Sequence, residues 1–414
     1  MCYNKYEGKY SCFLIWRQIQ FSSVPGGRVS DYNLADQIVA ILTGNFINAM
    51  AFDFFKSFKS ISGKSSLGLD IGTSSIKIVE LEKKGGRFEL LNYGSFELMG
   101  SSSLNQQNYE NQSILKLPDQ EITVGIQELV KKSGFRSMGV IASIPSFSTF
   151  ATVIEMPYIS NENLARALPY EAKKYIPIPL DEVVVDWSIV GVTNGQDGVQ
   201  GRPSSVEIFL AAVPKDETER YRNIIKNAGL KLNAIELENS ALIRALLGND
   251  LSPTVIVNIG GRSTSIIIVN RGYERVSHNY EVGGFEITKS ISQSLSVSLE
   301  KAEELKKKFG LIKKDDNIIS EAITPLINMM VFETQKTISN YEEAKKEKIA
   351  NIILVGGLSN MPGMIGYFKE KLGRQIVLGN PLSRLIYAPE LNQISDELNG
   401  VFSVGIGLAM RDVR

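Results

Sequence analysis

Residues 67–77 read Leu67-Gly68-Leu69-Asp70-Ile71-Gly72-Thr73-Ser74-Ser75-Ile76-Lys77. An apolar strand-like lead ends in Asp-x-Gly, small hydroxyl residues follow, and β-branched residues then return together with a lysine. This layout is typical of a β-hairpin whose turn wraps around phosphates. Glycine lets the backbone approach closely, Thr73 and Ser74 offer N–H and hydroxyl donors, and Lys77 supplies a positive charge. Asp70 is a candidate partner of a hydrated Mg²⁺, although a purely structural hairpin would also explain the stretch.

A second segment repeats this layout at residues 254–269. A β-branched strand runs into Asn258-Ile259-Gly260-Gly261-Arg262-Ser263-Thr264, and a second β-branched strand follows. A third element, at residues 351–364, places Gly356-Gly357-Leu358 directly after an apolar strand. The chain thus holds two candidate phosphate-binding hairpins of the same layout, followed by a strand that runs into a Gly-Gly turn.

Composition limits the class of protein. The 414 residues carry 45 basic and 45 acidic side chains, so the net charge does not indicate nucleic-acid binding. Both cysteines, Cys2 and Cys12, lie near the start of the chain, which argues against a disulfide framework or a thiolate metal site in the body. The single histidine, His278, leaves little for a histidine-based catalytic triad. No uninterrupted apolar run is long enough for a transmembrane helix.

The chain before the first hairpin differs from the rest, and we treat residues 1–65 as an N-terminal extension. The preferred interpretation is that translation begins at Met50, and a genuine extension is the alternative. The basic and aromatic segment 51–59 could lie on a membrane surface, or it could pack on the body of the protein.

Hydrophobic periodicity gives a coarse map of the remainder. Residues 146–232 are predicted to form a compact α+β insertion. On a further helix, Glu303 and Lys306 are three residues apart and therefore share one face. Helices are predicted at 121–133, 164–175, 216–229, 234–247 and 325–348, and strands at 139–145, 183–190 and 206–213.

The two hairpins and the Gly-Gly turn resemble those of the actin/Hsp70/sugar-kinase ATPase superfamily. Within it, Tyr170-Glu171-Ala172-Lys173-Lys174-Tyr175-Ile176-Pro177-Ile178-Pro179-Leu180 resembles a segment that marks the PilM family of actin-like type IV pilus assembly proteins. Ile144-Pro145-Ser146, Glu155-Met156-Pro157 and the segment 403–411 are similar to that family as well. The resemblance covers about residues 65–414. The related cell-division protein FtsA shares the architecture.

The resemblance implies an α/β fold of the actin-like two-lobe ATPase type. Its duplicated RNase H-like core would carry an α+β insertion subdomain of the FtsA/PilM type. The implied divisions are 66–145 for the first part of core subdomain 1A, 146–232 for the insertion, 233–250 for a return to 1A, 251–284 for the first part of core subdomain 2A, 285–350 for helical subdomain 2B, 351–382 for a return to 2A, and 383–414 for a final return to 1A.

The resemblance also implies that ATP and Mg²⁺ bind between the lobes. Asp70 and Asn258 would hold the metal, the latter through water, and Asp70 and Glu238 are the candidate catalytic residues. The positions that match the family's nucleotide-binding motifs are Asp70, Gly72, Thr73, Ser74 and Lys77 in the first hairpin, Asn258, Gly260, Gly261, Ser263 and Thr264 in the second, and Gly283, Gly284, Glu303, Lys306, Gly356, Gly357 and Leu358 beside the adenosine.

Asn258 departs from the superfamily pattern, which usually has aspartate at this position. An asparagine keeps an oxygen ligand but loses a charge, and it cannot act as a base. We therefore expect this protein to bind ATP and to hydrolyse it slowly or not at all.

Partners follow from the resemblance in the same way. The family captures the cytoplasmic N-terminal peptide of the inner-membrane protein PilN in a groove between the first core subdomain and the insertion. The expected location is the cytoplasm, peripheral at the inner face of the inner membrane, together with other pilus assembly components and without nucleic acid. The sequence leaves three points open: weak contact with the membrane surface, self-association, and a role in a type II secretion system. The alternatives are a polymerising division protein like FtsA and a kinase of the same fold.

Overall fold

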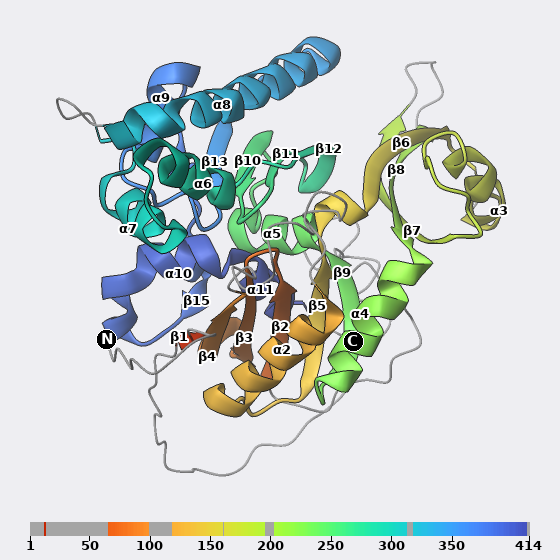
Figure 1. Ribbon diagram of the computed structural model, residues 1–414. Helices are drawn as coiled ribbons and strands as arrows, with labels where there is room; N and C mark the ends of the chain where they lie inside the picture. Colours follow the sequence, from red (N-terminus) through yellow and green to blue (C-terminus); the bar gives the residue numbers. More distant parts are fainter. Residues whose placement is uncertain are drawn as a thin grey trace.

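The computed structural model describes residues 12–13, 65–98, 118–159, 161–194, 203–312 and 318–411. It contains two large sheets, a smaller third sheet and helices that cover or separate them (Figure 1). The segment 51–59 and most of the extension before residue 65 lie outside the described residues. Within those residues, no helix combines the length and the apolar character that a membrane crossing requires.

The first sheet has the strand order β1-β4-β3-β2-β5-β9, with β15 pairing on β4. β2, β3 and β4 form an antiparallel meander, and β5 and β9 then add in parallel. The last five residues of β2 are buried, as the apolar lead into the first hairpin predicted. The strands are β1 Cys12–Phe13, β2 Ser65–Ile71, β3 Ser75–Lys84, β4 Arg87–Glu97, β5 Gly139–Ile144, β9 Lys231–Leu237 and β15 Leu385–Ile386.

The second sheet repeats this plan in the order β12-β11-β10-β13-β14. Again three strands form an antiparallel meander and two strands add in parallel. The repetition confirms the predicted duplicated core. The strands are β10 Thr254–Ile259, β11 Thr264–Asn270, β12 Tyr273–Tyr280, β13 Asn351–Val355 and β14 Val377–Leu378.

Two helices, α5 Glu238–Leu247 and α11 Ser403–Ala409, lie between the two sheets (Figure 1). Their apolar side chains share one core with residues of both sheets, among them Ile141, Ile256 and Val355. α11 lies so close to β2 that a Cβ on Gly68 would be 2.1 Å from the carbonyl oxygen of Gly405. The prediction of one helix over 234–247 is wrong in its first part, because residues 231–237 form β9 and the helix begins only at Glu238.

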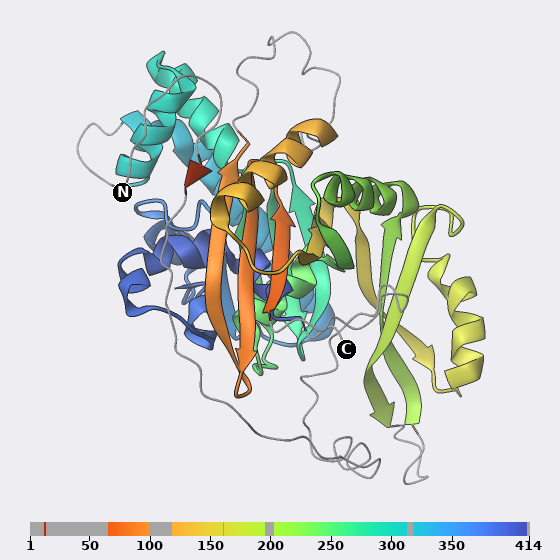
Figure 2. The ribbon, with the colours of Figure 1, turned by 90° about the horizontal axis from the view of Figure 1, so that it is seen from below.

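Most of the remaining helices cover the outer faces of the two large sheets (Figures 1 and 2). On the first sheet, α2 and α4 lie side by side, and their buried residues join its core. α6, α7, α8 and α9 form the corresponding cover of the second sheet. These helices are α2 Asp119–Ser133, α4 Lys215–Asn227, α6 Gly284–Leu295, α7 Leu299–Phe309, α8 Ile318–Lys345, α9 Met364–Leu372 and, near the C-terminus, α10 Ser395–Val401.

The third sheet projects from the side of the first lobe, which is the first sheet with its helices (Figure 2). It is antiparallel with the order β6-β8-β7, and α3 Asn161–Ala172 packs on one of its faces. Its strands are β6 Phe150–Pro157, β7 Val183–Asn194 and β8 Pro203–Pro214. We call β6, β7, β8 and α3 the insertion. The short 3₁₀ turn η3 Ser146–Ser148 connects β5 of the first sheet to it.

Candidate functional site

The turns of the two predicted hairpins have the same backbone geometry. Gly72 N–H donates to the Ser75 carbonyl (3.0 Å) between β2 and β3, and Gly260 N–H donates to the Ser263 carbonyl (2.9 Å) between β10 and β11. Each turn therefore has one glycine at the equivalent position.

The two turns approach each other closely. A Cβ on Gly261 would lie 2.2 Å from Ser74 Oγ and 2.5 Å from Ser74 Cβ. Real Cβ atoms do not make contacts this short, so only glycine fits at position 261 in this arrangement. The structure thus brings the predicted phosphate-binding residues of both halves to one place.

Asp70 lies at the end of β2 and is 7% exposed. Lys77 lies opposite Asp70 on β3, and its Nζ is 3.1 Å from Asp70 Oδ2. Ser143 Oγ donates to Asp70 Oδ1 (3.3 Å). A buried carboxylate held by a lysine and a hydroxyl remains an acceptor for the water shell of a hard cation. Ser143 was not predicted, although it lies near the carboxyl end of a strand parallel to β2, where polar side chains of adjacent strands meet.

Glu238 is the second carboxyl group of the site and begins α5. Asn258 Nδ2 donates to its Oε1 (3.0 Å), and the backbone N–H of Ser146 donates to its Oε2 (3.2 Å). Burial, and then the charge of Asp70, raises the pKa of Glu238 to about 7. Asn258 thus acts as a hydrogen-bond donor to Glu238, a role that aspartate could not fill.

The predicted adenosine-side residues also adjoin the second hairpin. Gly284 N–H donates to the Gly260 carbonyl (3.0 Å), so α6 begins directly against that turn. Lys306, on α7, is 7% exposed, and its Nζ is 2.6 Å from Glu303 Oε2 and 2.9 Å from Thr288 Oγ1. Burial lowers the pKa of the Lys306 ammonium, and the ion pair with Glu303 opposes this effect. Glu303 and Lys306 thus lie on one face of α7, as their three-residue spacing predicted.

The Gly-Gly turn lies on the other side of the second hairpin. Gly356 has φ +94°, and a Cβ there would be 2.3 Å from the Ile259 carbonyl oxygen and 2.8 Å from Asn258 Oδ1. Gly357 is exposed, and Leu358 N–H lies 3.5 Å from the Ile259 carbonyl. Position 356 therefore requires glycine for both its conformation and its surroundings.

Thr264 differs from the other candidate phosphate ligands. Its side chain is fully buried, and its hydroxyl donates to the Val282 carbonyl (2.7 Å). Thr73, Ser74 and Ser263 are at least partly exposed at the two turns. Among the described residues, no three His, Cys, Asp or Glu side chains gather into a metal-binding group, so a cation here would rely on Asp70, water and phosphate oxygens.

Comparisons with known proteins place this site in a family context. The family model described as type IV pilus assembly protein PilM matches residues 68–413. Cell division protein FtsA of Enterococcus faecalis is 22% identical over 386 residues, covering 79% of this chain and 84% of FtsA. FtsA of Bacillus subtilis is 25% identical over 351 residues, covering 76% and 78%.

Two solved structures show the same fold. A PilM-PilN type IV pilus biogenesis complex superposes with a TM-score of 0.69 at 22% identity, covering 84% of this chain and 98% of that one. The ethanolamine utilization protein EutJ of Carboxydothermus hydrogenoformans gives a TM-score of 0.50 at 16% identity, covering 90% and 99%. These likenesses confirm the predicted actin-like fold class.

Proposed function

Because this chain belongs to the type IV pilus assembly protein PilM family, we propose that it is an ATP-binding scaffold of a pilus assembly complex. In this proposal it binds ATP with Mg²⁺ between the two hairpins and binds the cytoplasmic N-terminal peptide of a PilN-like inner-membrane protein. The observation that carries the nucleotide part is the close meeting of two equivalent hairpin turns at Ser74 and Gly261.

The residues around the turns fit a nucleoside triphosphate with its metal. N–H and hydroxyl groups of Thr73, Ser74 and Ser263 would donate to phosphate oxygens, and Lys77 would offset their charge. Asp70 would hold Mg²⁺ through water, and the ion would neutralise the phosphate charge. Gly283, Gly284, Glu303, Lys306 and the turn 356–358 would adjoin the adenosine.

Slow turnover forms part of the proposal. In this proposal Glu238 would be the carboxyl group that orients an attacking water, and its two oxygens each accept a hydrogen bond from the protein. Asn258 adds neither a charge for the metal nor a base. The protein would therefore hold ATP as a structural ligand for longer than an active ATPase does.

The partner part of the proposal is supported by the similarity to a PilM-PilN complex. The peptide would bind between the first core subdomain and the insertion, and the protein would be held at the cytoplasmic face of the inner membrane through its partner. In that position it would connect other pilus assembly components, or those of a related type II secretion system, to the membrane protein.

A binding titration tests the proposal directly. The full chain is titrated with the N-terminal peptide of the host's PilN-like protein, with and without Mg-ATP, and with a scrambled peptide of the same composition as control. We expect saturable binding of the native peptide and no saturable binding of the scrambled peptide. Absence of binding to folded, ATP-loaded protein would remove the partner assignment.

The FtsA relatives favour one second candidate function, since five of them match 76–84% of this chain. A polymerising division protein would sediment in an Mg-ATP-dependent way at micromolar concentration. The same preparation therefore separates the two functions, because a monomeric scaffold stays in the supernatant and binds the peptide.

A further inference from the structure

Ser146, the first residue of η3, contacts both halves of the candidate nucleotide site. It is 6% exposed. Its backbone N–H donates to Glu238 Oε2 (3.2 Å), while its hydroxyl lies 3.0 Å from Ser265 Oγ and 3.0 Å from Asn279 Oδ1. Ser265 and Asn279 belong to β11 and β12 of the second sheet. One residue at the entrance to the insertion thus holds the buried carboxylate and the second lobe together.

These hydrogen bonds and one pair of facing strand residues form a closed circuit. Asn258 donates to Glu238, and Asn258 lies opposite Ser265 in the β10–β11 register. The amide oxygen of Asn279 can only accept, so the Ser146 hydroxyl donates to it, and the Ser265 hydroxyl then donates to Ser146. A displacement of Glu238 or Asn258 would therefore change the position of Ser146.

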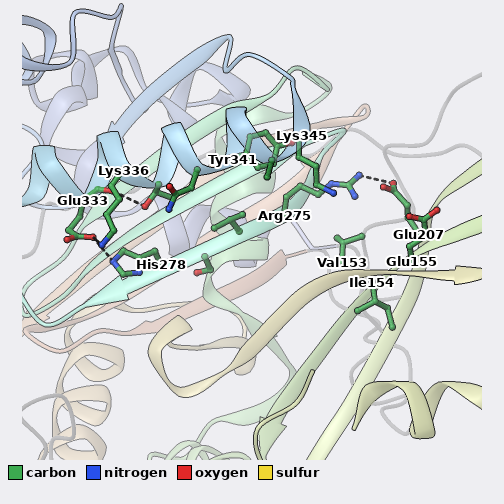
Figure 3. A pocket seen from close by; sticks show the side chains of 15 residues that line it. Val153, Ile154, Glu155, Glu207, Arg275, His278, Glu333, Lys336, Tyr341 and Lys345 are labelled. Carbon is green, nitrogen blue, oxygen red and sulfur yellow. Dashed lines mark hydrogen bonds and ion pairs between the residues drawn. The ribbon is translucent and has the colours of Figure 1, made fainter. Parts of the chain in front are cut away.

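A second polar contact joins the insertion to β12. Arg275 Nη2 is 3.1 Å from Glu207 Oε2 on β8, and the Arg275 side chain is only 10% exposed. Figure 3 shows this ion pair at one end of a hollow of about 470 Å³, which β6, β12 and α8 enclose. Near the other end, His278 of β12 faces Glu333 of α8. The Arg275–Glu207 ion pair thus joins the insertion to β12, the strand that Ser146 contacts through Asn279, and the hollow lies beside β6.

We propose that Ser146 is a positioning residue that transmits the state of the nucleotide site to the insertion. Its hydroxyl forms hydrogen bonds with β11 and β12 of the second lobe, just before the insertion begins. Its N–H donates to Glu238, so the position of Ser146 depends on that of Glu238. Movement of the lobes on ATP binding would then shift η3 and β6, and the hollow gives β6 room to move. The inference rests on the proposed function, because the insertion forms one side of the proposed peptide groove.

The test compares Ser146→Ala with wild type in the full chain. The substitution keeps the N–H that Glu238 accepts and removes only the cross-lobe hydroxyl. The measured quantity is the ratio of the PilN-like peptide's Kd without and with Mg-ATP. In wild type we expect this ratio to differ from one, and Ser146→Ala should bring it about 3- to 10-fold closer to one, the worth of one hydrogen bond.

Ser148→Ala is the matched control, because it removes from the same turn a hydroxyl that has no partner among the described residues. It should keep the wild-type ratio. A wild-type ratio of one, or the same ratio in Ser146→Ala, would overturn the proposal. If Ser146→Ala does not fold, Ser265→Ala removes one of its two cross-lobe hydrogen bonds from the other side and should move the ratio in the same direction.

Amide hydrogen exchange gives a readout that needs no peptide. We expect Mg-ATP to slow exchange over residues 146–157 in wild type and much less in Ser146→Ala. If no peptide binds but this difference is present, the partner assignment fails and the role of Ser146 stands. If the peptide binds and ATP changes neither its affinity nor the exchange, the role of Ser146 fails and the scaffold function stands.

Discussion

Asn258 donates a hydrogen bond from its amide nitrogen to Glu238, and Nδ2 and Oε1 are 3.0 Å apart. This contact joins β10 of the second sheet to α5, the helix between the two sheets. The amide supports the Glu238 carboxylate without adding a second negative charge to a site that already holds Asp70. The asparagine that departs from the superfamily pattern therefore has a structural role here.

The first prediction concerns this asparagine. Wild-type protein should release phosphate from ATP very slowly, and Asn258→Asp should release it faster, because it restores the carboxylate that the superfamily usually has at this position beside the metal. Single-turnover phosphate release with Mg-ATP measures both rates. Fast release by wild type would contradict the assignment of a slow or inactive ATPase.

The second prediction concerns Glu274, a buried residue of β12. Among the described residues, neither its Oε2 nor the nearby Asn239 Oδ1 has a hydrogen-bond partner, and burial raises the pKa of Glu274 from the ordinary 4.5 to about 7. Between pH 4.5 and pH 7, the folded state therefore binds more protons at Glu274 than the unfolded state does. The contribution of Glu274 to stability is therefore fully present below pH 4.5 and is lost as the pH rises through 7.

Glu274→Gln removes this titration and adds a donor that Asn239 can accept. At pH 8 it should raise the free energy of unfolding by about 2–3 kcal/mol, and the gain should vanish near pH 5. Urea unfolding at both pH values measures it, with Glu281→Gln, an exposed change just beyond the end of β12, as control. An equal effect at both pH values would contradict the assignment.

The third prediction tests the meeting of the two hairpins. Gly261→Ala places a methyl group 2.2 Å from Ser74 Oγ and 2.5 Å from its Cβ, so a change of Ser74 rotamer cannot relieve the clash. ATP affinity should fall about tenfold, which corresponds to about 1.4 kcal/mol. Adding Ser74→Gly removes both clashing atoms and should restore part of the affinity in a calorimetric titration. Unchanged affinity of the single variant would show that the turns are not this close in solution.

The fourth prediction concerns the buried ion pair of α7. Lys306→Met leaves the partly buried Glu303 and the Gly284 carbonyl without their cation, and unfolding should become easier by about 2 kcal/mol. Combining it with Glu303→Gln should recover most of this loss. Urea unfolding midpoints of wild type, the two single variants and the double variant, at constant m-value, measure the coupling between the two residues. Additive effects of the two changes would argue against a stabilising ion pair.

Local sequence was sufficient where one segment determines the geometry. Each hairpin carries its strands and its glycine turn within a single stretch, and Glu303 and Lys306 lie on one helix face. The segment 234–237 was assigned wrongly because Ala, Ile, Glu and Leu also suit a helix, and parallel pairing with β5 makes it a strand. The contacts of Ser146 join residues 92 to 133 positions apart in the chain, so only the assembled fold brings them together.

The packing of α11 against β2 has a consequence for biosynthesis. The second lobe is continuous in sequence, from β10 to β14, so it can complete its core while synthesis is still under way. The inner face of β2 must wait for residues 403–409, because Gly68 lies against Gly405. The first half of the chain to leave the ribosome is therefore the last to complete its core, and the apolar inner face of β2 lacks this cover until the C-terminal residues are made, which favours aggregation in that interval.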